Sequence, residues 1–291
     1  MLVDTSEFRR PERSNHMKFM NSLSWRPVPA LAALSIAALL LAQAPSPPAP
    51  TNPAIPDWAY PGSKSHRQIA PPADFRRPSK TTNTPIGIFD GQTDVGSAIL
   101  PGSASYDAGT KQYTINSAGY NVWYQRDEFQ YLWKKLSGDV SLAGTVSFPD
   151  GNGYGDRKVV FIIRQDLDDD SIEVMTARHG AGLIHLAQRT TKGGQIRATF
   201  NIPAPKRPND APADAPLPVA PWRIGIEKKG DVFALFISEN DAPLHQVGDT
   251  LTFHMDQPFY AGIGFASHTP DKSDTAVLSD VVLENAAGKF R

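Results

Sequence analysis

An acidic segment between two predicted strands, 166–173 (DLDDDSIE), holds the densest set of side chains that could do chemistry. Hydrolysis of a glycosidic bond requires two carboxyl groups that converge on one sugar, and a strand supplies them when alternate residues are acidic. This segment lies between strands and lacks that spacing. Its residues Asp166, Asp168 and Asp170 instead predict either a solvated acidic turn or a calcium site, because calcium binds several oxygen ligands.

The other reactive residue types form no catalytic pattern. His179 and His185 are separated by a glycine turn that could bring them onto adjacent strands, but the chain has no H-E-x-x-H motif. It has no G-x-S-x-G turn and no cysteine. The glycine-rich run 151–155 precedes neither a helix nor a Lys-Ser/Thr pair, so it is not a phosphate loop. We therefore predict no catalytic residue, and no cofactor other than the calcium ion considered above.

Large aromatic residues alternate with other residues in the stretch 119–147. Alternation predicts half-buried strands, and the break at 137–139 (Ser-Gly-Asp) predicts a hairpin between 128–136 and 139–147. Four large rings in eleven residues exceed what the core side of one strand needs. We therefore expect some of them to form a sugar-stacking surface on the second face; the four are Trp123, Phe129, Tyr131 and Trp133.

Short apolar runs separated by turn residues fill the chain from about residue 88 onward, with no amphipathic helical pattern. Many short strands at near-regular spacing predict a two-sheet sandwich or barrel. The proline-rich segment 203–221 predicts a surface loop, since proline cannot donate to a sheet. The predicted strands are 103–107, 111–117, 121–124, 128–136, 139–147, 157–165, 171–178, 182–190, 195–201, 222–228, 231–238, 244–247, 258–267 and 275–284.

Six stretches of this body are distinctive: 102–119 (GSASYDAGTKQYTINSAG), 127–139 (DEF…LSGD), 160–171 (VFIIRQDLDDDS), 186–194 (LAQRTTKGG), 222–238 (WRIGIEKKGDVFALFIS) and 260–268 (YAGIGFASH). In their order and spacing they resemble a family of extracytoplasmic concanavalin A-like lectin/glucanase domains of undefined function. The resemblance implies an all-β, jelly-roll sandwich of two antiparallel sheets over 88–286. Domains of this family also occur appended to Tol-type β-propellers and secreted glycosidases.

The resembling family carries an arginine at the places that match Arg164 and Arg189, each at the end of an apolar run. These arginines could bind a ligand beside an aromatic platform. Alternatively they could pair with carboxylates at the rim of the sheet, namely Asp127, Glu128 or Glu173.

The resemblance places Trp133, Arg164 and Arg189 on central strands, and we nominate them as ligand-binding residues. We nominate Trp123 and His268 for the rim of the same site, although His268 could also be a hydrogen-bonded residue at a strand end. The assignment of Trp133 depends on register, because a shift of one residue exchanges it with Leu132.

The N-terminal region predicts export. Residues 31–42 (LAALSIAALLLA) are apolar but too short to span a hydrocarbon core of ~30 Å comfortably. With basic residues before them and Ala-Gln-Ala at 42–44, they predict a signal peptide over 1–44 with an over-long n-region, and a periplasmic or extracellular bacterial protein; an uncleaved anchor is the alternative. Residues 45–87 predict a proline-rich linker, in which 58–60 (Trp-Ala-Tyr) either docks on the body or forms a recognition motif, and 287–291 a tail.

The charge of the body disfavours a nucleic-acid partner. Residues 90–286 hold 17 Lys and Arg against 25 Asp and Glu, a formal charge of −8, in a chain of net charge −1. We expect a non-enzymatic binding module for carbohydrate or another envelope polymer. The alternatives are an envelope protein–protein interaction domain that binds a Tol-type propeller and, disfavoured by the missing carboxylate pair, a glycoside hydrolase.

Overall fold

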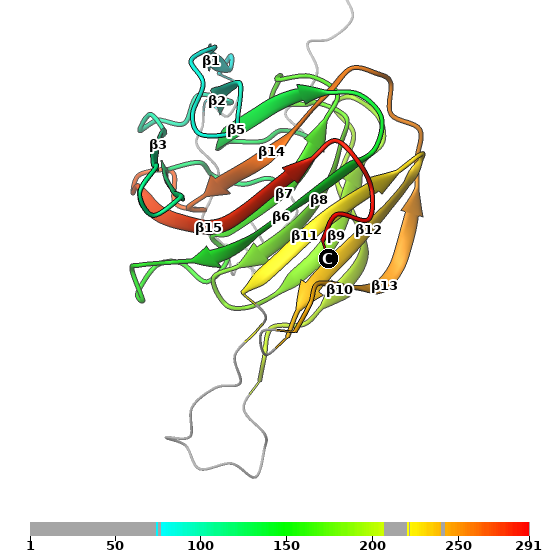
Figure 1. The fold of residues 1–291 in the computed structure, drawn as a ribbon. Helices are drawn as coiled ribbons and strands as arrows, with labels where there is room; N and C mark the ends of the chain where they lie inside the picture. The colour runs from blue at the N-terminus through cyan, green and yellow to red at the C-terminus, as the bar shows by residue number, and fades with distance from the viewer. Residues whose placement is uncertain (1–73, 75–76, 207–219, 221, 240–241, 291) are drawn as a thin grey trace, which may run out of the picture. The chain divides into compact units, whose positions relative to one another are not determined.

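Strands account for most of the chain that the computed structural model describes, which comprises residues 74, 77–206, 220, 222–239 and 242–290 (Figure 1). All of these residues belong to the second of two compact units, Ala49–Arg291. The strands are β1 (Lys80–Thr82), β2 (Gly91–Val95), β3 (Ser103–Asp107), β4 (Gln112–Ser117), β5 (Phe129–Leu136), β6 (Val140–Ser147), β7 (Lys158–Arg164), β8 (Glu173–His179), β9 (Ile184–Arg189), β10 (Arg197–Ile202), β11 (Arg223–Lys229), β12 (Val232–Ser238), β13 (His245–Thr252), β14 (Phe259–Ala266) and β15 (Asp274–Glu284).

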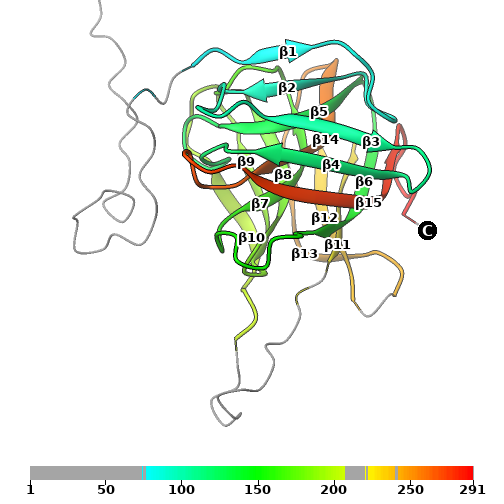
Figure 2. The same ribbon diagram turned by 90° about the vertical axis from the view of Figure 1, so that its left-hand side faces the viewer.

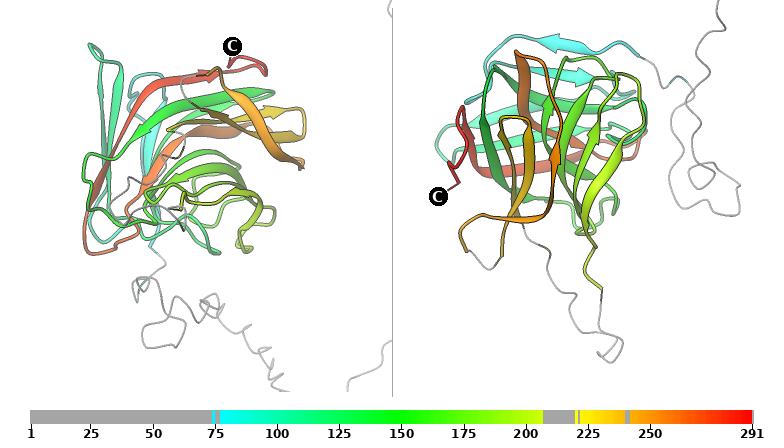
Figure 3. Two further views of the ribbon diagram at one scale, coloured as in Figure 1. Left: turned by 90° about the horizontal axis from the view of Figure 1, so that it is seen from below. Right: turned by 90° about the vertical axis from the view of Figure 1, so that its right-hand side faces the viewer.

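Two antiparallel sheets lie face to face as two layers (Figure 3). One has eight strands in the order β1-β2-β5-β14-β7-β8-β9-β10, and the other has seven in the order β13-β12-β11-β6-β15-β4-β3. Non-consecutive strands are neighbours in both sheets. The predicted fold class, a concanavalin-like jelly-roll sandwich of two antiparallel sheets, is confirmed.

The core between the sheets is built from alternate residues of strands on both sides. Leu132 of β5, Phe161 of β7 and Ile263 of β14 point into it from the eight-stranded sheet, and Leu142 of β6 and Ile226 of β11 from the other. All five side chains are fully buried. Burial of such side chains contributes roughly 1.5–3 kcal/mol each, so the alternating pattern both orients the strands and drives the two layers together.

The central strands of the eight-stranded sheet are also buried on the opposite face of that sheet, which we call the outer face. A second apolar cluster covers it, with Tyr131, Trp133, Ile162 and Met175 among its members. Every residue of β7 and of β8 is therefore buried. The expectation that some aromatic residues of β5 serve a second face is confirmed, but on that face they pack against other apolar groups.

Glycines on β14 make room for the aromatic side chains of β5. Gly264 lies opposite Tyr131 and Gly262 opposite Trp133 in the antiparallel register. A Cβ atom added at Gly264 would lie 2.5 Å from Cδ2 of Phe129, far inside ordinary van der Waals contact. The packing of the aromatic cluster therefore depends on glycine, which has no side chain, at these positions of β14.

The predicted hairpin between 128–136 and 139–147 is wrong. β5 pairs with β2 and β14, whereas β6 pairs with β11 and β15 in the other sheet. The turn at 137–139, with Gly138 at a φ of 83°, carries the chain from one sheet to the other. Two strands that face each other across a core show the same alternation as two paired strands, so the pattern did not distinguish them.

Two polar strands at the edge of the eight-stranded sheet were not predicted, and one predicted strand is wrong. Figure 2 shows β1 and β2 side by side at this edge, and β1 lies inside the segment expected to be linker. Residues 121–124 form no strand; Val122 makes only an isolated bridge with Asp127. Apolar alternation does not detect β1 and β2, because their pairing depends mainly on backbone hydrogen bonds.

Several expectations concern residues outside the described ranges. These are the signal peptide 1–44, most of the linker 45–87 including the aromatic residues at 58–60, most of the loop 203–221, and the last residue of the tail. No helix in the described part of the chain is long and apolar enough to cross a membrane.

The glycine packing on β14 yields a stability prediction. We expect Gly264→Ala to lower the free energy of unfolding by roughly 1–3 kcal/mol, because the new methyl group must displace the ring of Phe129. Gly151→Ala is the control, since no atom lies within 4 Å of a Cβ built there. Urea denaturation followed by tryptophan fluorescence measures both. Equal stability of the two variants would contradict the packing argument.

Candidate functional site

The outer face of β7, β8 and β9 carries two separate polar groups, one at each end of the strands. At one end Arg164, Glu173 and Arg189 lie opposite one another in register. At the other end Lys158 lies opposite His179. Because side chains alternate and the rise is about 3.3 Å per residue, Lys158 and Arg164 share this face but lie roughly 20 Å apart along β7.

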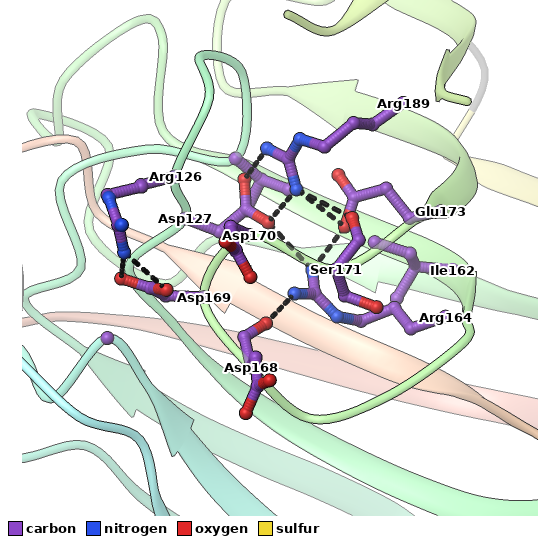
Figure 4. Close-up of polar contacts among 12 residues, drawn as sticks. Arg126, Asp127, Ile162, Arg164, Asp168, Asp169, Asp170, Ser171, Glu173 and Arg189 are labelled. Carbon is purple, nitrogen blue, oxygen red and sulfur yellow. Dashed lines mark hydrogen bonds and ion pairs between the residues drawn. The ribbon is translucent and has the colours of Figure 1, made fainter. Parts of the chain in front are cut away.

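The first group is a buried ion-pair network centred on Asp127 (Figure 4). Arg164 Nη1 donates to Asp127 Oδ2 at 2.8 Å and also to Glu173 Oε2. Arg189 donates from Nη1 to Asp127 Oδ2 and from Nη2 to Asp127 Oδ1, both at 2.8 Å. The side chains of all four residues are fully buried.

Other donors of the two arginines bind backbone carbonyls of the covering loops, whereas Arg164 Nε has no hydrogen-bond partner among the described residues. Arg164 Nη2 donates to the carbonyl of Asp168 at 2.5 Å, and Arg189 Nη2 donates to that of Tyr124 at 2.8 Å. Arg189 Nη1 also donates to the carbonyl of Ser171 at 2.9 Å. The network therefore fastens the segments 118–128 and 165–172 onto the sheet.

Electrostatics within the network keep Asp127 ionised. Burial by itself raises the pKa of the Asp127 carboxyl, but Arg189 and Arg164 outweigh it and hold that pKa below its ordinary value. Burial, and then the charge of Asp127, raise the pKa of Glu173. Burial lowers the pKa of the Arg164 guanidinium, but Glu173 and Asp127 outweigh it, so the net shift is upward.

One of the two alternatives for the arginines was pairing with carboxylates at the rim of the sheet. The structure shows this pairing, because Arg164 and Arg189 bind Asp127 and Glu173. The third carboxylate considered, Glu128, binds Arg77 instead, at 2.5 Å. A ligand contact for either arginine remains a prediction, and it would require the covering loops to move.

The network predicts that Asp127 is critical for stability. We expect Asp127→Asn to lower the free energy of unfolding by about 3–5 kcal/mol, because two buried guanidinium groups lose their shared carboxylate. Lys134→Met, which removes a half-exposed ion pair with Asp90, should change it by less than about 1 kcal/mol. Thermal or urea unfolding compares them. An Asn variant as stable as the wild type would show that the network does not hold the loops.

The acidic turn does not fit a calcium ion. Lys192 Nζ lies 2.7 Å from Asp166 Oδ2, 2.5 Å from Asp168 Oδ2 and 3.4 Å from Asp170 Oδ1. The ammonium thus takes the central position that a cation would need. Across the residues that the structure describes, no group of three or more His, Cys, Asp or Glu side chains is arranged to hold a metal.

The second polar group lines a pocket of about 210 Å³ at the opposite end of the outer face. Strands β7 to β10 supply one wall, and the segments before β5, before β7 and after β14 supply the others. Asn201 of β10 lies opposite His185 of β9 in register. The lining residues are Asn121, Trp123, Asp156, Lys158, His179, Leu183, His185, Ala198, Asn201 and His268.

Aromatic rings surround the polar groups of the pocket. The rings of Trp123 and His185 are 5.1 Å apart between centroids, as are those of His179 and His185. The His268 ring stacks on Tyr154 at 5.1 Å. The prediction that the glycine turn brings His179 and His185 onto adjacent strands is confirmed.

Burial keeps these histidines neutral near pH 7. Desolvation first, and then the nearby charge of Lys158, lower the pKa of His179 well below its ordinary value and that of His268 to about 3. His185 shifts the same way, through burial and then His179. Burial lowers the pKa of Lys158 to about 8, opposed by the charge of Asp156.

Trp133 belongs to neither polar group. It lies on the outer face and not between the sheets, where Leu132 points. It is only 6% exposed, its Nε1 donates to Thr93 Oγ1 at 2.9 Å, and its ring meets Tyr260 edge-on. In this structure its ring faces are covered by other side chains.

The structure therefore divides the five nominated ligand residues into three places. Trp123 and His268 meet at the pocket, Arg164 and Arg189 meet in the network, and Trp133 lies apart. Sequence reasoning missed the pocket residues Asn121, Asp156, Lys158 and Asn201. The sequence did indicate Lys158, because it is a charged residue at the start of an otherwise apolar strand, KVVFIIR. Alternation also places it on the same face as Arg164.

Comparisons with known proteins extend to the fold alone. No family model and no curated protein matches the sequence. Similar solved structures include a functionally unknown protein from Saccharomyces cerevisiae, with 12% identity over 72% of this chain and 97% of that one and a TM-score of 0.42.

Two further similar structures have named activities. The carbohydrate-binding module CBM66 from Bacillus subtilis is 15% identical over 63% of this chain and 91% of its own, with a TM-score of 0.36. An alginate lyase from Klebsiella pneumoniae is 11% identical over 64% and 85%, with a TM-score of 0.38. The function of this chain is therefore inferred from its own residues.

Proposed function

We propose that this chain is an exported binding module whose carbohydrate ligand occupies the pocket at Trp123. The observation that carries the proposal is the combination of an indole wall with convergent buried polar groups in one concavity. The volume of about 210 Å³ is below the roughly 300–1,000 Å³ of pockets for drug-sized ligands, so we expect the pocket to take only a small part of a glycan.

The pocket offers a partner both for the apolar C–H side of a pyranose and for its hydroxyl groups. Trp123 is partly exposed and can offer an apolar ring face to the C–H side of a sugar. Lys158, Asn121 and Asn201 supply donors and acceptors for hydroxyl groups. Buried polar groups of this kind give specificity, because a ligand that fails to bind them leaves them unpaired.

The pocket favours binding over hydrolysis. Asp156 is the single carboxylate among the described lining residues, whereas both classes of glycoside hydrolysis use a pair. The buried carboxylates Asp127 and Glu173 cannot supply a second one, because they lie at the other end of the strands and bind Arg164 and Arg189.

A glycan array that carries neutral and acidic oligosaccharides tests the proposal. We expect the wild-type protein to bind a defined subset, and Trp123→Ala to weaken that binding by about 30-fold, the loss of about 2 kcal/mol typical of a central aromatic contact. Trp222→Ala is the matched control, because Trp222 is 41% exposed and packs under Arg178 outside the pocket.

Two results would contradict the proposal. Absence of binding to every glycan by folded wild-type protein would reject the ligand class. Equal binding by the wild type and Trp123→Ala would place the site elsewhere. Circular dichroism of each variant verifies the fold.

A further inference from the structure

The deepest charged group of the pocket is a lysine that no carboxylate of the described residues contacts. Lys158, the first residue of β7, is 2% exposed, and its side chain lies on the outer face beside His179. Its ammonium donates one long hydrogen bond, 3.5 Å to the Val122 carbonyl, and lies 5.4 Å from the centre of the Trp123 ring. No salt bridge joins Lys158 to a carboxylate of the described residues.

The groups that face Lys158 do not neutralise it at contact distance. His179, His185 and His268 are held neutral by burial. Among the carboxylates, Asp156 raises the pKa of Lys158 most. Its side chain is 36% exposed, however, and its Oδ1 lies 3.6 Å from His179 Nδ1. The carboxylates of Asp127 and Glu173 act only from the far network.

Two histidines of the pocket also have buried nitrogen atoms without a hydrogen-bond partner among the described residues. These atoms are Nδ1 and Nε2 of His179 and Nε2 of His185. Each can donate or accept according to its tautomer. Together with the ammonium of Lys158, these nitrogen atoms give the buried part of the pocket unused hydrogen-bonding capacity. Asp156 is more exposed than they are.

We propose that this pocket selects an acidic sugar, a uronate whose carboxylate lies against the ammonium of Lys158. The inference rests on the proposed glycan-binding function and narrows its ligand class. A buried charge is costly unless it is paired, so a ligand carboxylate supplies what the fold omits. Charge-assisted hydrogen bonds of this kind are roughly twice as strong as neutral ones, and a neutral sugar would leave the lysine unpaired.

Isothermal titration calorimetry with trigalacturonate and with its carboxyl-reduced, neutral counterpart tests the inference. We expect the uronate to bind at least about 10-fold more tightly to the wild type at pH 7, the scale of one charge-assisted hydrogen bond. Lys158→Met should abolish that preference. Lys134→Met makes the same change of net charge outside the pocket and should retain it.

A second measurement needs no variant. Only protonated Lys158 attracts a carboxylate, so the uronate affinity of the wild type should fall as pH rises through about 8, the pKa of Lys158 in the free protein. Over about pH 7.5–9.5 the carboxylate of the sugar stays ionised, and binding of the neutral trisaccharide should not change in parallel.

The outcomes separate this inference from the function on which it rests. Equal affinity for the two trisaccharides, or a preference that survives Lys158→Met, overturns the inference and leaves carbohydrate binding intact. If neither trisaccharide binds, the inference is likewise overturned, and the glycan array decides the proposed function independently.

Discussion

Burial of the central strands of the eight-stranded sheet on both faces is the constraint on which the rest of the structure depends. A sheet in a sandwich needs one apolar face, but here β7 and β8 are buried throughout. Polar side chains on the outer face therefore cannot rely on bulk water. Each must find a partner or lie in a cavity, because an unpaired buried polar group costs roughly 1–3 kcal/mol.

The two ends of the outer face meet this constraint differently. At one end two arginines and two carboxylates pair closely, and several of the other arginine donors bind the carbonyls of the covering loops. Replacing such a network by apolar residues is often neutral, so its contribution here is better understood as positioning. It determines where the segment 118–128 crosses the sheet, and therefore where Trp123 lies.

At the other end the partners are incomplete. Lys158, His179 and His185 are nearly as buried as the network residues, and they line a pocket. The network also leaves Arg164 Nε and Glu173 Oε1 without a hydrogen-bond partner among the described residues, but its charges are paired, whereas no described carboxylate forms a salt bridge with Lys158. When one polar group on a face is paired within the protein and another opens on a pocket, the first typically supports the structure and the second binds a ligand. The same covering segment serves both ends, because Asp127 anchors it in the network and Trp123 forms a wall of the pocket.

The residue pattern by itself determined the fold class and most of the strands. Alternating apolar residues and glycine-containing turns specified β3 within its observed bounds and most others to within two residues, because each strand buries one face against the core. Alternation did not decide which strands pair, since β5 and β6 lie in different sheets. It also missed β1 and β2, which are polar and depend on backbone pairing.

The candidate site was decided by tertiary structure. The sequence identified Trp123, His268, Arg164 and Arg189 as notable, but placed them in one ligand set. The fold separates them because the alternation of side chains decides only which face of the sheet a residue lies on. Its position along the strand and the path of the covering loop decide at which end of the outer face it lies. Lys158 and Arg164 have the same parity in one strand, and only the contacts brought by Trp123 and by Asp127 give them different environments.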